Sequence, residues 1–217
     1  MQKSLYSMML MDSVVREIDR IALQKNTNRS NLVNQILAEY VSMVTPEQRV
    51  DSIFRYIEQV MNNQREIVPF VEPNNFTMSL KSSLAYKYRP TIKYEVELYR
   101  VPKGTIGELS VIYRTQSGTL QQALHTFFSY WKQLEDSYLP QHFTGTHAQY
   151  RLEDGKFVRS IALPHNRDYT GEEIGDAISA YIQMFDEMMK GFVNGNYTPS
   201  GLESRYVAYL NRGIGIL

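Results

Sequence analysis

Hydrophobic and polar positions alternate at the start of the chain, which predicts a short strand. Tyr6, Met8 and Leu10 share one face of an extended segment, and Ser7 and Met9 share the other face. A lone strand exposes a row of unpaired backbone N–H and C=O groups. This strand is therefore expected to pair with a second one.

Two amphipathic helices are predicted after the strand. Asp12 or Ser13 is expected to cap the first helix, and Asn28 or Ser30 the second, after the polar run of residues 25–29. Apolar side chains recur at helical spacing in both helices: Val14, Val15, Ile18, Ile21 and Ala22 in the first, and Leu32, Val33, Ile36, Leu37, Tyr40 and Val41 in the second. One copy of this unit cannot cover its own apolar face, so we expect a second copy to cover it.

This order of elements, with the polar turn Asn28-Arg29-Ser30 before Leu32-Val33, resembles the ribbon-helix-helix superfamily of the Arc and MetJ type. The resemblance covers residues 1–45, about a fifth of the chain. It implies an intertwined homodimer whose antiparallel two-stranded ribbon enters the major groove of double-stranded DNA. It also implies that the start of the second helix holds a phosphate, where exposed amides and the helix dipole favour an anion.

The resemblance assigns two sets of contact residues. If Tyr6, Met8 and Leu10 face the core, the base-facing positions are Lys3, Leu5, Ser7 and Met9, and the phosphate-binding positions are Arg29, Ser30 and Asn31. Leu5 and Met9 can touch thymine methyl groups but cannot read hydrogen bonds, so base readout falls on Lys3 and Ser7. Residues 1–45 carry five basic and four acidic side chains, a net charge of +1.

A third helix is predicted to start at Thr45-Pro46, because Thr45 can cap it, proline suits the first helical position, and Gln48 completes a capping box. Its apolar face contains Val50, Ile53, Phe54, Ile57, Val60 and Met61. We expect residues 46–63 to form a linker helix. The proline-containing and polar stretch of residues 68–75 marks its boundary with the rest of the chain.

Residues 64–217 are predicted to form an α+β domain with an antiparallel or mixed sheet, in the order βββαββα. Strand periodicity occurs in residues 76–81, 92–98 and 109–113, and a helix with a capping box at Thr119 and Gln122 comes after them. A hairpin then turns at Asp154-Gly155, before a helix capped by Thr170 with Glu173. A short helix from Ser200 is expected near the end. No family resemblance is evident in this part of the chain.

Composition narrows the function classes. The chain of 217 residues has 23 basic and 23 acidic side chains, so no overall positive field attracts it to a polyanion, and DNA contacts would depend on a local patch. Without cysteine there is no disulfide or thiolate site. No run of apolar residues is long enough to span a bilayer, and the first ten residues lack a secretory signal, which favours a cytoplasmic protein.

Candidate chemistry outside the first 45 residues is sparse. His142 and His147 are close in sequence, but no third ligand is indicated, so neither a metal site nor a cofactor is expected. The run Tyr86-Lys87-Tyr88-Arg89 interleaves aromatic rings with cations, which is typical of single-stranded nucleic-acid platforms. If this run is a strand, however, the two tyrosines face the core and the two cations form a solvated basic face. We favour this second interpretation. No catalytic motif is found, so we expect a protein that is not an enzyme.

These observations favour a homodimeric, sequence-specific DNA-binding regulator, with transcriptional repression as its commonest role in the superfamily. Its C-terminal domain would sense a small molecule, recruit a protein or assemble higher oligomers. Plasmid partition and accessory roles in DNA transfer use the same fold. The alternative from another class is a dimeric interaction or scaffold protein, which keeps residues 1–45 only for dimerisation, as the apolar Leu5 and Met9 suggest.

Overall fold

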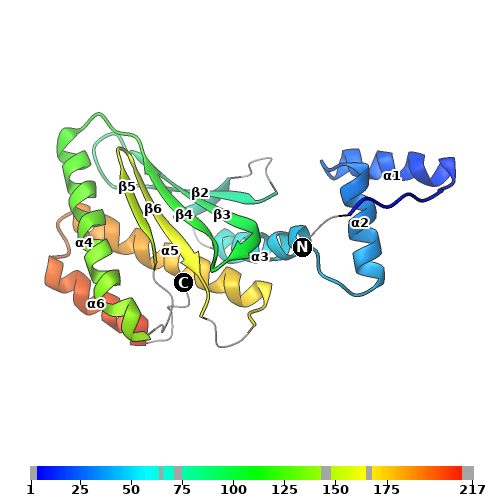
Figure 1. The fold of residues 1–217 in the computed structure, drawn as a ribbon. Coiled ribbons are helices and arrows are strands. Elements are labelled where there is room, and N and C mark those ends of the chain that lie inside the picture. Colours follow the sequence, from blue (N-terminus) through cyan, green and yellow to red (C-terminus); the bar gives the residue numbers. More distant parts are fainter. Residues whose placement is uncertain (1–3, 64–65, 71–74, 143–147, 165–167, 212–217) are drawn as a thin grey trace. The chain divides into compact units, whose positions relative to one another are not determined.

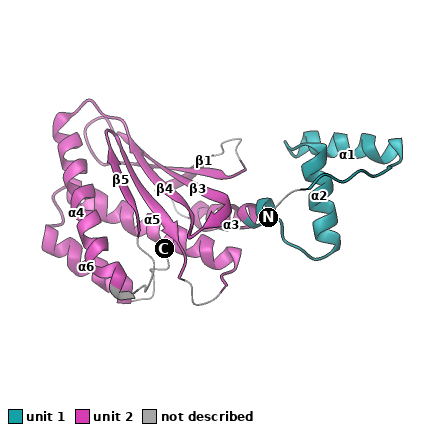
Figure 2. Ribbon diagram, viewed as in Figure 1, with its two compact units in different colours: residues 1–49 teal, residues 50–217 magenta. Residues whose placement is uncertain are grey.

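The computed structural model describes residues 4–63, 66–70, 75–142, 148–164 and 168–211. The chain divides into two compact units, Met1–Arg49 (unit 1) and Val50–Leu217 (unit 2) (Figure 2).

Unit 1 contains two helices, α1 (Asp12–Gln24) and α2 (Arg29–Tyr40), which contact each other. Residues 4–11 belong to neither a helix nor a strand of the single chain, so the predicted ribbon remains a prediction that needs a second copy. The predicted cap of α1 by Asp12 or Ser13 is wrong, because the helix begins after Met11, which makes no side-chain capping bond, and Asp12 lies in its first turn. The cap of α2 is Asn28, one of the two predicted residues.

The third helix, α3 (Pro46–Asn62), begins with the predicted capping box. The amide of Gln48 donates to Oγ1 of Thr45 at 3.2 Å, and the amide of Thr45 donates to Oε1 of Gln48 at 2.9 Å. Its inner face carries Val50, Ile53, Ile57 and Met61, all buried in the core of unit 2. From Val50 onward this helix is therefore a layer of the second unit.

Unit 2 is built on a six-stranded antiparallel sheet in the order β1-β2-β3-β4-β6-β5 (Figure 1). The strands are β1 (Ile67–Phe70), β2 (Thr77–Ser83), β3 (Thr91–Lys103), β4 (Thr105–Tyr113), β5 (Tyr150–Glu153) and β6 (Lys156–Ala162). The α+β class with an antiparallel sheet is confirmed. The predicted order omitted β1, a four-residue strand at the edge of the sheet that contains Pro69.

Two long helices, α4 (Gly118–His142) and α5 (Gly171–Val193), pack on the sheet, and the shorter α6 (Pro199–Asn211) contacts both of these helices. Figure 1 shows all three gathered on the same side of the sheet. Aromatic contacts join the layers, since Phe157 of β6 stacks on Phe128 of α4 at 5.1 Å and Tyr94 of β3 meets Phe185 of α5 edge-on at 6.3 Å. Inward and outward positions alternate along β3, as its periodicity predicted.

The turns and caps of unit 2 agree with the predictions in part. The β5–β6 hairpin turns at Asp154-Gly155, where Gly155 has φ +71°. The capping box of Thr170 and Glu173 on α5 is also present. Two other caps lie two residues earlier than predicted: Ser117 caps α4 in place of Thr119, and Thr198 caps α6 in place of Ser200. Among the described residues, every helix is too short or too polar to cross a lipid bilayer.

Candidate nucleic-acid interface

The described part of the segment predicted to form the ribbon, residues 4–11, is exposed in one chain. Leu5 and Met9 are 99% and 100% exposed, whereas Met8 and Leu10 are 55% and 44% exposed. Met8 and Leu10 belong to the face predicted to point inward, as does Tyr6, which is 80% exposed. Leu5 and Met9 belong to the face predicted to meet the groove. Lys3, the basic member of the base-facing set, lies outside the described residues.

Arg29 is held by a carboxylate on the neighbouring helix. Its Nε donates to Oδ1 of Asp19 at 2.7 Å and its Nη2 donates to Oδ2 at 2.5 Å. The hydrogen bond from Arg29 lowers the pKa of Asp19, and the same bond raises the pKa of Arg29. Both side chains are about half exposed, so water and salt weaken this pair. A phosphate can replace the carboxylate, because the guanidinium fork matches both groups.

The start of α2 offers fewer donors than the sequence predicted. The amide of Asn31 already donates to Oδ1 of Asn28 at 2.9 Å, which is the helix cap. The amide of Leu32 donates to the carbonyl of Asn28 at the start of the helix. The amide of Ser30 lies two residues before that of Leu32, so it has no carbonyl of its own helix to bind. Within the predicted set, the Arg29 side chain and the Ser30 amide are therefore the groups best placed for a phosphate.

Unit 1 buries very little apolar surface on its own. In its described part the buried hydrophobic side chains are Ala22 and Leu32. Exposed apolar side chains come from both helices and both flanking segments, and include Tyr6, Met8, Leu10, Val14, Leu23, Ile36, Leu37, Tyr40, Val41, Met43 and Val44. Two helices with so small a core do not hold together by their own packing.

A turn in unit 2, at residues 86–89, was not predicted from the sequence. Tyr86 to Arg89 do not form a strand but a tight turn between β2 and β3, with φ +66° at Tyr88 and +43° at Arg89. The favoured interpretation of a core-facing tyrosine pair is therefore wrong: Tyr88 is 88% exposed, while Tyr86 packs partly against the core. Pro90 was the available signal, because proline restricts the residue before it and often closes a turn.

The structure does not describe the side chains of the histidine pair. His147 lies outside the described residues, as does the side chain of His142. Within the described ranges, no group of three or more histidine, aspartate or glutamate side chains could hold a metal ion.

Comparisons of the chain with models of protein families, with curated proteins and with solved structures found no match. The structure itself shows a small two-helix unit followed along the chain by an α+β unit.

Proposed function

We propose that this chain is a sequence-specific DNA-binding protein that acts as a homodimer through residues 1–45, in the manner of ribbon-helix-helix transcriptional repressors. One observation carries the proposal: the described part of unit 1 has two helices, a preceding segment outside helix and strand, and almost no core. A second copy supplies what is missing, because pairing two extended segments satisfies their backbones and brings the exposed faces of four helices together.

In this proposal the contacts divide into reading and positioning. Lys3, Leu5, Ser7 and Met9 face the base edges from the paired ribbon. Arg29 exchanges its carboxylate partner for a phosphate, and the amide of Ser30 donates to the same anion. The exposure of Leu5 and Met9 and the half-exposed ion pair of Arg29 leave these groups available for such contacts.

A second candidate function is a dimeric interaction or scaffold protein. One observation favours it: residues 4–11 carry no charged side chain, so the described part of the ribbon presents hydroxyl and apolar groups alone. Groove-reading ribbons rely on polar or basic side chains, whereas an apolar ribbon suits a segment that serves only to dimerise the chain. On this proposal unit 1 dimerises the chain and unit 2 carries the interaction.

Selection of bound fragments from the source genome by the full chain tests the proposal, because it establishes binding and identifies the operator together. We expect a small set of enriched sites with two related half-sites. Arg29→Ala should weaken binding to all sequences about equally and reduce the salt slope by about 1 for each phosphate that is no longer neutralised. Arg20→Ala is the matched control, since Arg20 is also an exposed arginine of unit 1 in an ion pair, with Glu17.

The reading positions should behave differently from Arg29. Lys3→Ala should cost about 1–3 kcal/mol per reading contact and relax preference at one position of each half-site. Leu5→Ala and Met9→Ala should alter preference at A·T pairs if they touch thymine methyl groups. If no genomic fragment is enriched, or if none of these variants changes binding, the scaffold proposal replaces the first.

A further inference from the structure

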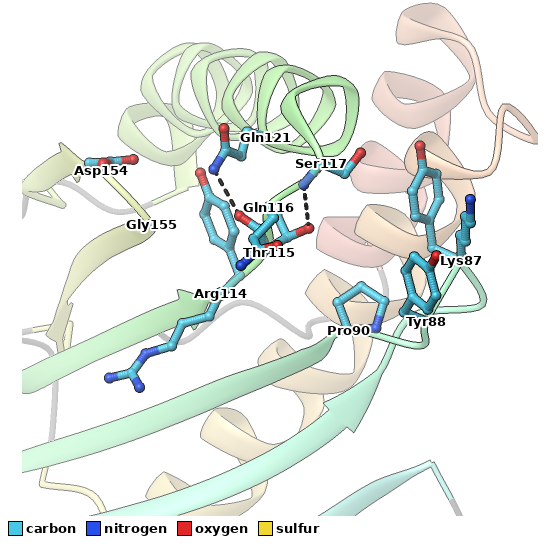
Figure 3. A pocket seen from close by; sticks show the side chains of 12 residues that line it. Lys87, Tyr88, Pro90, Arg114, Thr115, Gln116, Ser117, Gln121, Asp154 and Gly155 are labelled. Atoms are coloured by element: carbon cyan, nitrogen blue, oxygen red, sulfur yellow. Dashed lines mark hydrogen bonds between the residues drawn. The ribbon is translucent and has the colours of Figure 1, made fainter.

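A hollow of about 970 Å³ lies in unit 2 where three loops meet (Figure 3). Its walls are the β2–β3 turn, the loop from β4 into the start of α4, and the β5–β6 turn. A smaller hollow of about 360 Å³ continues from it and shares Tyr113, Gln121 and Asp154. The larger volume is at the upper end of the ~300–1,000 Å³ typical of small-molecule sites.

One wall combines aromatic rings with a cation. Tyr86, Lys87 and Tyr88 line the hollow from the β2–β3 turn, and Nζ of Lys87 lies 5.1 Å from the ring centroid of Tyr88. Figure 3 shows Lys87 and Tyr88 side by side at one end of the hollow. Tyr88 and Arg89 both adopt the left-handed backbone region, which residues other than glycine seldom do. Such backbone conformations cluster at ligand-binding sites.

The opposite wall is polar. The first turn of α4 and the loop before it bring amide and hydroxyl side chains to the hollow, among them Gln116, Ser117 and Gln121. Nε2 of Gln121 donates to the carbonyl of Thr115 at 2.9 Å, which fixes that side chain across the loop. The positive end of the α4 dipole also favours an anion here. Asp154 lies at the far end from Lys87 and offers a carboxylate (Figure 3).

These three chemistries match the parts of a nucleotide. Exposed tyrosine rings stack on any nucleobase, and a neighbouring lysine or a helix start attracts a phosphate. A carboxylate accepts hydrogen bonds from ribose hydroxyls or from an exocyclic amine. Arg114 also lines the hollow, but Figure 3 shows its guanidinium pointing away from Lys87 and Tyr88, so Lys87 is the cation of the aromatic wall.

We propose that this hollow binds a nucleotide, stacked on the Tyr88 ring with its phosphate between Lys87 and the start of α4. The nucleotide is either free or part of a single strand, since both present the same base and phosphate. The hollow lies wholly within unit 2, so its occupancy does not depend on whether residues 1–45 bind DNA.

Calorimetric titration of the full chain tests this proposal, with the four ribonucleoside monophosphates as one set of probes and a single-stranded oligothymidylate as the other. We expect saturable binding with one site per chain. Binding of a monophosphate identifies a free nucleotide as the ligand, whereas binding of the oligonucleotide alone identifies a strand. No binding of either probe at millimolar concentration overturns the proposal.

Substitutions then locate the site. Tyr88→Ala and Lys87→Gln should each weaken binding at least tenfold, whereas Tyr88→Phe should retain it because the ring remains. Lys103→Gln is the matched control, since Lys103 is an exposed lysine at the end of β3, outside the hollow. Tyr88 is 88% exposed, so these variants should fold, as an unchanged Tm would verify. Equal binding by wild type, Tyr88→Ala and Lys87→Gln would contradict the assignment.

Discussion

Removal of the buried guanidinium of Arg159 should destabilise unit 2 strongly. Arg159 on β6 and Glu135 on α4 form an ion pair in which Nε donates to Oε2 at 2.8 Å, and their side chains are 1% and 0% exposed. The guanidinium also lies 4.5 Å from the ring centroid of Tyr181, whose hydroxyl accepts from Nε1 of Trp131. Burial acts to lower the pKa of Arg159, but the charge and hydrogen bond of Glu135 together with the neighbouring Tyr181 and Tyr150 outweigh burial, so the pKa is raised and the group stays charged.

The magnitude depends on what each substitution leaves behind. Arg159→Met removes one charge and leaves the Glu135 carboxylate buried without its partner, which typically costs about 3–5 kcal/mol. Replacing both residues, as Glu135→Leu with Arg159→Met, removes the charges together and fills similar volume. Such replacements are often neutral, so the double variant should recover at least half of the stability that the single variant loses.

Urea denaturation followed by tryptophan fluorescence measures this directly. Trp131 is the single tryptophan of the chain, is fully buried, and lies in the core of unit 2 beside this network. Its emission therefore reports the unfolding of unit 2. A loss below about 1 kcal/mol in Arg159→Met, or a double variant less stable than both single variants, would refute the reasoning that an unpaired buried charge dominates.

Two further predictions concern the sheet and the contact between α3 and α5. The hydrogen bond from Arg151 lowers the pKa of Glu108, so this carboxylate contributes stability above its usual pKa of 4.5 and loses it as the pH falls through the lowered value. Glu108→Gln should therefore lower the free energy of unfolding by up to about 1 kcal/mol at neutral pH and by progressively less in acid. Urea titrations at pH 7 and pH 3 would check this. The same difference in stability at both pH values would exclude the ion pair as the cause. Gly175→Ala should lower the Tm, because the added Cβ would meet the carbonyl oxygen of Ile53 at 3.0 Å, whereas Gly118→Ala, with open space around its Cβ, should not.

Periodicity predicted most of the elements because their apolar faces are long and regular. The run from Leu120 to Leu134 on α4 and the alternation from Ile92 to Leu98 on β3 are buried as the pattern indicated. Strand β1 was not predicted, because four residues that include a proline carry too little periodicity to distinguish a strand from a loop. The caps of α4 and α6 were misplaced for a different reason: in each case two capping residues lie two positions apart, and the packing of the helix selects between them.

The candidate sites depend on contacts between distant residues, which local patterns do not encode. Asn28 was predictable as a cap because its partner is three residues away. The pairing of Arg29 with Asp19 joins two helices and depends on how they cross. The hollow beside Tyr88 is assembled from three loops separated by dozens of residues. Of these loops, only the β2–β3 turn was recognisable from the sequence as a candidate binding segment, because aromatic rings and cations alternate in it.

Completion of unit 1 by a second copy of the chain is the central claim. Sedimentation equilibrium of the full chain at micromolar concentration tests it most directly. We expect a mass twice the 25.2 kDa of one chain, and monomers or aggregates after deletion of Met1 to Leu10. A folded monomer of the full chain, or an intact dimer after the deletion, would contradict the claim.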